Sequence, residues 1–463
     1  MKYLTLIILC CVTQANFAQN LADSFFTVDT IIITGNKRTK ANIITRELTF
    51  RQGDTIRNWE YHREQSRKQL INLFLFNEIR IDREGNVVVV RVTERWYLWP
   101  YPELDYADRN LSQWLLTRDP KRLIYGLRLE WYNIRGRNET MQLDFITGYT
   151  RMINFGYKVP YFNKRQTWGA QIFATYSSNK EVWYKTEDDK VQFFRDRDRD
   201  LIQRRGLELA VTHRKKIFSY HQFYSGFLII SIRDTIRKNE VNPGFLFGNA
   251  LAQRENYIGY NFIHDRRDFK GFPLHGYLVK SGLEAAKLIG GVSTVNTIAF
   301  KTSLSRYFRL AGPLFGSFNV TGRYYSLKNP PYNKVRALGY GKDYIRGYEL
   351  KVIDGSDFFL GKVETKYRFL NRTYPFMKRV KNYEVLPLAL YLSAYFDAGF
   401  VNYDVQNSVS RIDSVVNKLP NSWQYGFGAG LNIVMFYDYC FRAEYSFDKF
   451  LNNRMYFSFV ASM

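Results

Sequence analysis

Five consecutive residues that could hold a metal ion or form ion pairs stand in the middle of the chain: His264, Asp265, Arg266, Arg267 and Asp268. One imidazole and two carboxylates are ligands that a metal ion could use. Aspartates this close to arginines more often pair with them, because a guanidinium offers a planar fork of donors to a carboxylate. We therefore favour ion pairs with Arg266 or Arg267 over a metal site.

A second charged group, Arg346, lies in a glycine- and tyrosine-rich stretch, residues 337–355, with strand-like sequence on both sides. Glycines allow such a loop to turn tightly. Most arginines in loops are solvated, so the tripeptide Arg-Gly-Tyr taken alone predicts an ordinary surface residue. Whether Arg346 has a partner can be judged only from the rest of the sequence.

No other residue pattern suggests catalysis. The sequence shows no nucleophile with a neighbouring base, no phosphate-binding loop and no zinc pattern among its five histidines. Cys10 and Cys11 fall in an apolar N-terminal stretch, so Cys440 is left alone and no disulfide framework can be built. We expect no enzyme activity, no catalytic residue, no metal and no cofactor.

The formal net charge is +24, from 67 Lys and Arg against 43 Asp and Glu. Such a charge first suggests a nucleic-acid binder. The basic residues, however, are spread along the whole chain, alternate with apolar residues and form no known nucleic-acid motif. We therefore expect no nucleic acid as partner, and a basic surface or lumen that faces anionic lipid or acidic polypeptide.

The N-terminus predicts a secretory signal peptide, residues 1–18. Lys2 precedes an apolar run that ends near Val12, and the small residue Ala18 suits a cleavage site. The apolar run is too short to cross a bilayer as a helix, and no later run is long enough. The mature chain is therefore expected to be exported and soluble, or to cross a membrane by β-strands.

Residues 25–96 predict a small α+β unit. The expected order is a strand over 26–34, a helix over 41–48, a second helix over 59–72, and two strands, 78–82 and 87–92, joined by a Gly-Asn hairpin turn. This is the size and pattern of one small folded domain.

Residues 97–463 predict a transmembrane barrel. Segments of about ten residues alternate between apolar or aromatic and polar or small side chains, as expected for strands with lipid outside and a polar lumen inside. About sixteen such segments can be counted, and an even number brings both ends of the barrel to one side of the membrane. Two long breaks, 179–204 and 328–357, are expected to be surface loops, the first of them highly charged and solvated.

Short motifs in the first unit resemble the POTRA domain of the BamA/TamA family of outer-membrane proteins, the bacterial surface antigen type. They are Ile-Thr-Gly-Asn-Lys-Arg-Thr at 33–39, Ile-Thr-Arg-Glu-Leu at 44–48, Gly-Asp at 53–54 and the strand at 88–94. In that family POTRA domains lie in the periplasm and receive client chains, partly by pairing with an exposed strand edge. The resemblance implies one POTRA domain here, where BamA and TamA have several.

The barrel segments resemble the same family. An Asp-x-Arg-Asp that ends one strand and a Pro-x-x-Gly turn that opens the next form a family motif, matched here by Asp265, Arg267, Asp268, Pro273 and Gly276.

The segment Ile-Arg-Gly-Tyr at 345–348 resembles the family's signature loop, usually Val-Arg-Gly-Phe or Val-Arg-Gly-Tyr, which folds into the lumen and pairs its arginine with an acid on a wall strand. Residues 395–400 resemble that wall strand. The resemblance therefore implies a functional loop of Arg346, Gly347 and Tyr348, with Asp397 as the lumen partner of the arginine.

The resemblance implies a function in assembly, insertion or translocation of other polypeptides at the outer membrane, without a cofactor. Implied partners are unfolded outer-membrane protein clients, periplasmic chaperones, accessory lipoproteins and outer-membrane lipid. A weak seam between the first and last strands would open sideways to let a client strand pair. The alternatives are a two-partner secretion transporter, a passive porin, and a surface-binding barrel without insertase activity.

Overall fold

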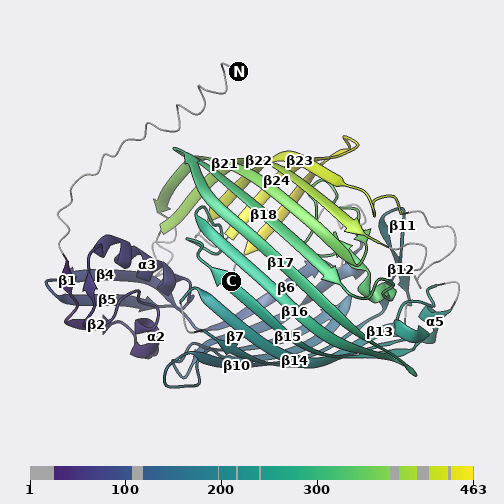
Figure 1. Cartoon of the computed structure of the whole chain (residues 1–463), viewed down its shortest axis with the longest axis horizontal. Helices are drawn as coiled ribbons and strands as arrows, with labels where there is room; N and C mark the ends of the chain where they lie inside the picture. The colour runs from purple at the N-terminus through teal and green to yellow at the C-terminus, as the bar shows by residue number, and fades with distance from the viewer. Residues whose placement is uncertain are drawn as a thin grey trace, which may run out of the picture.

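The computed structural model describes residues 25–106, 118–196, 198–214, 217–238, 241–375, 385–403, 417–435 and 439–461. A small α/β unit at the N-terminal end adjoins one rim of a large barrel (Figure 1). We call this rim the proximal rim and the opposite one, which carries β11, β12 and α5, the distal rim. The predicted signal peptide, residues 1–18, lies outside the described residues.

The N-terminal unit holds a three-stranded sheet of order β2-β5-β4, in which β2 runs parallel to β5 and β4 antiparallel to it. The predicted helices and closing hairpin are present, but the strand predicted over 26–34 is broken. The backbone of Val28 bonds to Asp54 and Gly53, whereas Asp29 bonds to Asn86, so the chain changes partner strand at this point. The elements are β1 (Phe26–Thr27), β2 (Thr30–Thr34), α2 (Ala41–Thr45), β3 (Thr55–Ile56), α3 (Trp59–Ile71), β4 (Phe76–Glu84) and β5 (Val87–Glu94).

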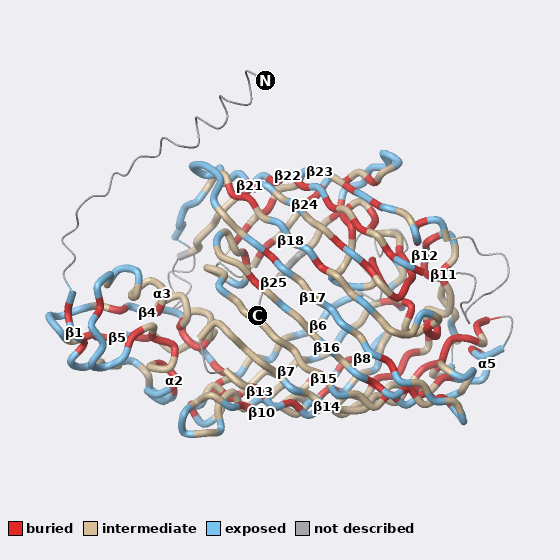
Figure 2. Tube along the Cα trace, in the orientation of Figure 1, coloured by how far each residue is buried: buried red, intermediate tan, exposed pale blue. Residues whose placement is uncertain are grey.

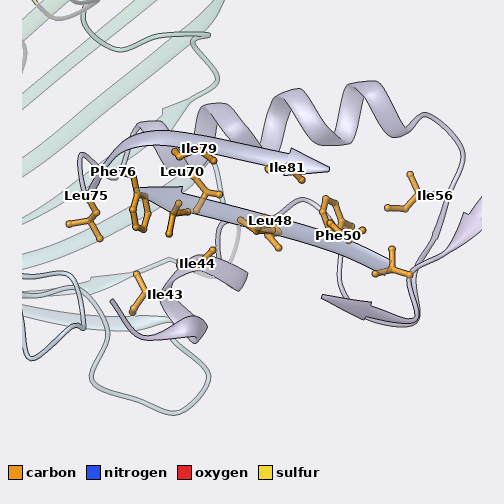
Figure 3. Packing of buried hydrophobic residues seen from close by; sticks show 14 of the residues in the cluster. Ile43, Ile44, Leu48, Phe50, Ile56, Leu70, Leu75, Phe76, Ile79 and Ile81 are labelled. Atoms are coloured by element: carbon orange, nitrogen blue, oxygen red, sulfur yellow. The ribbon is translucent and has the colours of Figure 1, made fainter. Parts of the chain in front are cut away.

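The two helices pack on this sheet around a small apolar core. Helix α3 begins at Asn58, whose side chain accepts a hydrogen bond from the Tyr61 N–H, and it buries Leu70 completely. Figure 3 shows Leu70, Leu75, Phe76 and Ile44 gathered near the barrel. Each such side chain contributes about 1.5–3 kcal/mol when it leaves water, which explains why so short a unit folds.

The barrel is a sixteen-stranded sheet in which each strand runs antiparallel to its neighbours, which confirms the predicted transmembrane barrel. Because the number is even, β25 ends at the rim where β6 begins. The strands are β6 (Leu98–Tyr106), β7 (Leu123–Ile134), β8 (Glu139–Gly148), β9 (Thr150–Val159), β10 (Trp168–Asn179), β13 (Ile202–His213), β14 (Ser219–Ile232), β15 (Ala252–Asp265), β16 (Gly276–Gly290), β17 (Ser293–Ala311), β18 (Leu314–Tyr325), β21 (Asp357–Pro375), β22 (Val385–Asn402), β23 (Gln424–Met435), β24 (Tyr439–Asp448) and β25 (Asn453–Ala461).

Alternation along the strands separates a lipid-facing side from a polar lumen. On β9, Ile153 and Phe155 are exposed on the outside, whereas Asn154 between them is buried and donates to the Asp144 carboxylate at 2.9 Å. Pairing each strand with its neighbours around a polar interior keeps most backbone groups bonded within the bilayer. In the described part of the chain, no helix has the length and apolar character needed to cross a membrane.

The distal rim is covered by packed loops, so the prediction of a solvated loop over 179–204 is wrong. A hairpin of β11 and β12 forms there (Figure 2), and its Val182 and Val191 are buried. Val182 packs with Ile202, Ile230 and Tyr332, which makes a small core above the barrel. The elements of the loops are η1 (Pro120–Arg122), β11 (Glu181–Glu187), β12 (Lys190–Arg195), α5 (Asp234–Arg237), η2 (Phe247–Asn249), η3 (Tyr332–Lys334), β19 (Arg336–Leu338) and β20 (Ile353–Asp354).

The sheet has two ends. Strand β25 pairs with β24 and β6 pairs with β7, but among the described residues no strand pairing joins β25 to β6. We call this break in the ladder the seam. Each end strand thus pairs along only one of its two edges.

Candidate functional site

The connection between β18 and β21 folds back into the barrel. Its strands β19 and β20 pair with each other, and the residues between them, 339–352, form what we call the lumenal loop. Ile345 and Tyr348 of this loop are buried against Leu360 and Val401 of the wall strands β21 and β22. Burial of these apolar side chains, rather than charge alone, keeps the loop inside.

Glycines let the loop backbone lie directly on the wall. Gly347 has φ 96°, a conformation that favours glycine, and a Cβ there would stand 2.7 Å from the Phe447 carbonyl oxygen. On the facing strand β23, a Cβ on Gly426 would stand only 1.9 Å from the Arg346 carbonyl oxygen. Gly426 is therefore needed for the close approach of the loop backbone to β23.

Arg346 and Asp397 form a buried pair, so the structure brings together the two residues that the resemblance paired. Asp397 accepts from the Arg346 backbone N–H at 3.1 Å, from Nε at 2.9 Å and from Nη2 at 2.6 Å. The guanidinium also lies 3.7 Å from the ring centroid of Tyr395. Burial lowers the pKa of the Arg346 guanidinium, but the hydrogen bonds and charge of Asp397 more than offset this and raise it above its ordinary value.

The pair belongs to a larger set of charges on β21, β22 and β24. Arg346 Nη1 is 3.5 Å from Glu444 and 3.9 Å from Glu364, while Lys362 Nζ is 3.7 Å from Asp397. Lys366 Nζ lies 3.5 Å from Glu364, and Arg442 Nη1 lies 3.7 Å from Glu444. We call these residues the lumenal charge cluster: Arg346, Lys362, Lys366 and Arg442 with Glu364, Asp397 and Glu444.

Two further contacts tie the loop to the last strands. Tyr348 donates to Gln424 Oε1 at 3.2 Å and accepts from the Lys449 N–H at 3.3 Å. Glu349 accepts from the Gly347 N–H at 2.9 Å and interacts with the side chain of Tyr456 on β25. Burial raises the pKa of the Glu349 carboxyl to about 7. The loop therefore contacts the strand that ends the sheet at the seam.

The motif at the β15–β16 connection forms a turn at the proximal rim. Asp265 accepts from Arg267 Nε at 2.9 Å and Nη2 at 2.8 Å, as predicted for these aspartates. Asp268 caps backbone N–H groups of the turn. Gly276 has φ 98° and lies against the Arg266 carbonyl, where a Cβ would stand 2.0 Å away.

Pro273 and His264 also lie at this turn. Pro273 lies in the turn and lines a cavity that reaches Arg346. His264, offered by the sequence as a metal ligand, instead contacts Ser219 Oγ at 2.9 Å and the Tyr277 hydroxyl at 3.2 Å.

Comparison with solved structures identifies the architecture. No protein-family model and no curated protein sequence matches the chain. BamA from Haemophilus ducreyi lacking POTRA domains 1–3 is 12% identical, with a TM-score of 0.52 over 94% of this chain and 84% of that chain. CdiB from Escherichia coli is 11% identical, with a TM-score of 0.51 over 97% of this chain and 93% of that chain. The chain has the barrel fold of BamA and CdiB.

Within this BamA-like barrel, sequence reasoning missed the partners of the central pair. Lys362, Glu364 and Lys366 alternate along β21, and Arg442 and Glu444 alternate along β24. Such period-two charges mark a polar lumen. The sequence could have flagged them as inward-facing, but not as neighbours of Arg346, because that needs the placement of a folded-back loop.

Proposed function

We propose that this chain is an outer-membrane protein that assists the insertion or translocation of other polypeptides, as the BamA/TamA resemblance implies. Residues 1–18 would be its signal peptide, residues 25–96 a single POTRA domain in the periplasm, and residues 97–463 the barrel. The observation that carries the proposal is the seam: two end strands, β6 and β25, which among the described residues each pair along one edge only, in a barrel with the fold of BamA and CdiB.

Unpaired strand edges explain how a cofactor-free barrel could act on a polypeptide. In a bilayer every unpaired backbone N–H or C=O is costly, so the edges of β6 and β25 favour pairing with any strand that arrives there. A client strand that adds to such an edge gains backbone hydrogen bonds regardless of its sequence. Unfolded outer-membrane proteins are therefore the proposed clients, with outer-membrane lipid as the surrounding partner and chaperones and accessory lipoproteins as proposed helpers.

The lumenal loop has a positioning role in this proposal. Arg346 fixes the loop to β22, Tyr348 fixes it to β23, and Glu349 reaches Tyr456 on β25. These contacts hold the wall beside the seam in one arrangement while the seam itself stays free. Loss of the central pair would loosen β25 and weaken any activity that depends on its edge.

A two-partner secretion transporter is the second candidate, because the fold resembles CdiB as much as BamA, with TM-scores of 0.51 and 0.52. Such a transporter would pass one dedicated polypeptide through the barrel. The buried lumenal loop favours the first candidate, because a polypeptide that passed through the lumen would have to displace this loop.

Depletion of the protein in the bacterium that produces it separates the candidates. Insertase function predicts a fall in the levels of many other outer-membrane barrels, measured by quantitative proteomics of the outer membrane. Loss of a single secreted polypeptide with unchanged barrels would instead indicate the transporter. No change in either would contradict both and leave a surface-binding barrel.

A further inference from the structure

Two cavities inside the barrel adjoin each other on the proximal side. The first, of about 490 Å³, lies beside the N-terminal unit and is lined by Glu47 and Arg95 among others. The second, of about 290 Å³, reaches Arg346 in the lumenal loop. Both are lined by Arg267 and Lys270, so they follow one another from the mouth of the barrel inward. We call them together the vestibule.

The vestibule carries a strong excess of positive charge. Ten of its lining residues are Lys or Arg, and only three are acidic. All three acids already hold a cation: Glu47 pairs with Arg214 at 2.5 Å, Asp265 with Arg267 at 2.8 Å and Glu364 with Lys366 at 3.5 Å. The remaining charge is therefore not neutralised by the vestibule's own carboxylates.

Three lysines, together with Arg95, carry this surplus. Lys158 on β9, Lys270 in the β15–β16 turn and Lys280 on β16 form no ion pair with the residues that the structure describes. Lys158 lies 5.9 Å from the ring centroid of Tyr220, which offers it only a weak partner. Cations gathered in a concave site with low-dielectric walls focus the field and attract anions from the adjoining solution.

We propose that the vestibule binds an acidic segment of a polypeptide client, whose carboxylates pair with Lys158, Lys270 and Lys280. This inference rests on the proposed function, which makes a polypeptide the substrate. The lysines come from three separate parts of the wall; all three line the first cavity and Lys270 also lines the second, an arrangement that suits a chain with several carboxylates better than one small anion. Tyrosines among the lining residues, such as Tyr101 and Tyr161, add ring faces for such a chain.

Electrostatic recognition of this kind acts mainly on capture and choice of client. Acidic segments entering beside the N-terminal unit would be drawn toward the lumenal loop and so toward the seam. Because exposed or half-exposed pairs are weak, each lysine contributes little alone and the site works through their sum.

Fluorescence anisotropy on the full-length protein in detergent micelles tests the inference. The probe is a fluorescein-labelled Glu-Ser repeat peptide, and the matched probe is a Gln-Ser repeat of equal length. We expect the Glu-Ser peptide to bind at low ionic strength, the Gln-Ser peptide not to bind, and binding to weaken steeply as salt is added. Equal binding of both peptides, or binding insensitive to salt, would overturn the inference.

A double variant, Lys270→Gln with Lys280→Gln, locates the site. We expect roughly tenfold weaker binding, the fold-change for two weak ion pairs. The matched control is Lys164→Gln with Arg165→Gln, which removes two exposed charges from the proximal rim outside the vestibule and should leave the affinity unchanged. An equal loss in the control variant would place binding on the general basic surface and refute the vestibule site.

Three further outcomes are informative. Complete displacement of the peptide by inorganic phosphate at matched charge concentration would point to a small-anion site and contradict a polypeptide ligand. Failure of the Glu-Ser peptide to bind, with client folding still accelerated by the protein, would refute this inference alone. Peptide binding without any acceleration of client folding would support the site and refute the insertase function instead.

Discussion

Replacing Asp397 should loosen the lumenal loop more than replacing Arg346, although the two residues form one pair. The lumenal charge cluster contains four cationic and three anionic side chains. Arg346→Met balances the cluster at three and three. Asp397→Asn leaves four cations with Glu364 and Glu444 as the only acids of the cluster.

The contacts set the size of each effect. After Arg346→Met, Asp397 keeps the backbone N–H at 3.1 Å and the Lys362 ammonium at 3.7 Å, so the cost should lie near the lower end of the range for breaking a buried pair, about 3 kcal/mol. After Asp397→Asn, Arg346 loses both charge-assisted bonds and faces Lys362 without an intervening carboxylate. The cost of Asp397→Asn should therefore lie near the upper end of that range, about 5 kcal/mol.

Urea unfolding of the barrel in phospholipid vesicles, followed by tryptophan fluorescence, measures these costs. Arg372→Met serves as control because Arg372 is exposed on β21 and forms no ion pair with described residues. The double variant Arg346→Met with Asp397→Leu should cost clearly less than the sum of the single variants, because each removes the charge that the other leaves unpaired.

The reasoning would be refuted if Arg346→Met cost as much as Asp397→Asn or more, since charge balance would then not govern the cluster. Costs below about 1 kcal/mol for both variants, equal to the control, would show that the lumen is wet enough to solvate either charge.

Three other changes test the architecture around the pair. Gly426→Ala should cost about 1–3 kcal/mol in the same urea assay, because its Cβ would meet the loop backbone, whereas Gly322→Ala, with its nearest neighbour at 3.9 Å, should cost far less. The raised pKa of Glu349 means that its protonated form favours the folded loop. Its contribution to the free energy of unfolding is therefore fully present below pH 4.5 and is lost as the pH rises through about 7. Glu349→Gln should abolish this part of the pH dependence of the unfolding midpoint, and an unchanged pH profile would contradict the prediction. Glu47→Ala should leave Arg214 without its carboxylate and loosen the contact of the N-terminal unit with the rim, at a cost of at most about 3 kcal/mol. The loss should be seen as faster hydrogen exchange in α2, and unchanged exchange would argue against this anchor.

The strands were predictable because their chemistry is repetitive. A strand between lipid and a polar lumen must alternate, so segments near Leu123, Gly276 and Leu314 could be placed from sequence, and strands begin at those residues. The covering of the distal rim was not predictable in the same way. The charges that follow the β11–β12 hairpin dominate its composition and hide Val182 and Val191, whose burial depends on contacts with distant loops.

The candidate site, like the fold, was predictable from the sequence only in part. The Arg346–Asp397 contact followed from the family resemblance, and the structure places the two residues together; their role in function stays a prediction. The charge cluster around them, and the anchor between Glu47 and Arg214, join residues far apart in the chain. No spacing in the sequence encodes such contacts, because they depend on where a loop and a small domain come to rest on the barrel.

Folding of a client in defined lipid is the most direct measurement of the central claim. The purified protein is reconstituted in liposomes, an unfolded outer-membrane barrel is added, and the rate of client folding is followed by its shift in gel mobility. We predict faster folding with the wild-type protein than with empty liposomes, and a weaker effect with Arg346→Ala. A client that folds no faster beside a correctly folded wild-type barrel would contradict the insertase function, and equal acceleration by Arg346→Ala would contradict the role given to the lumenal loop.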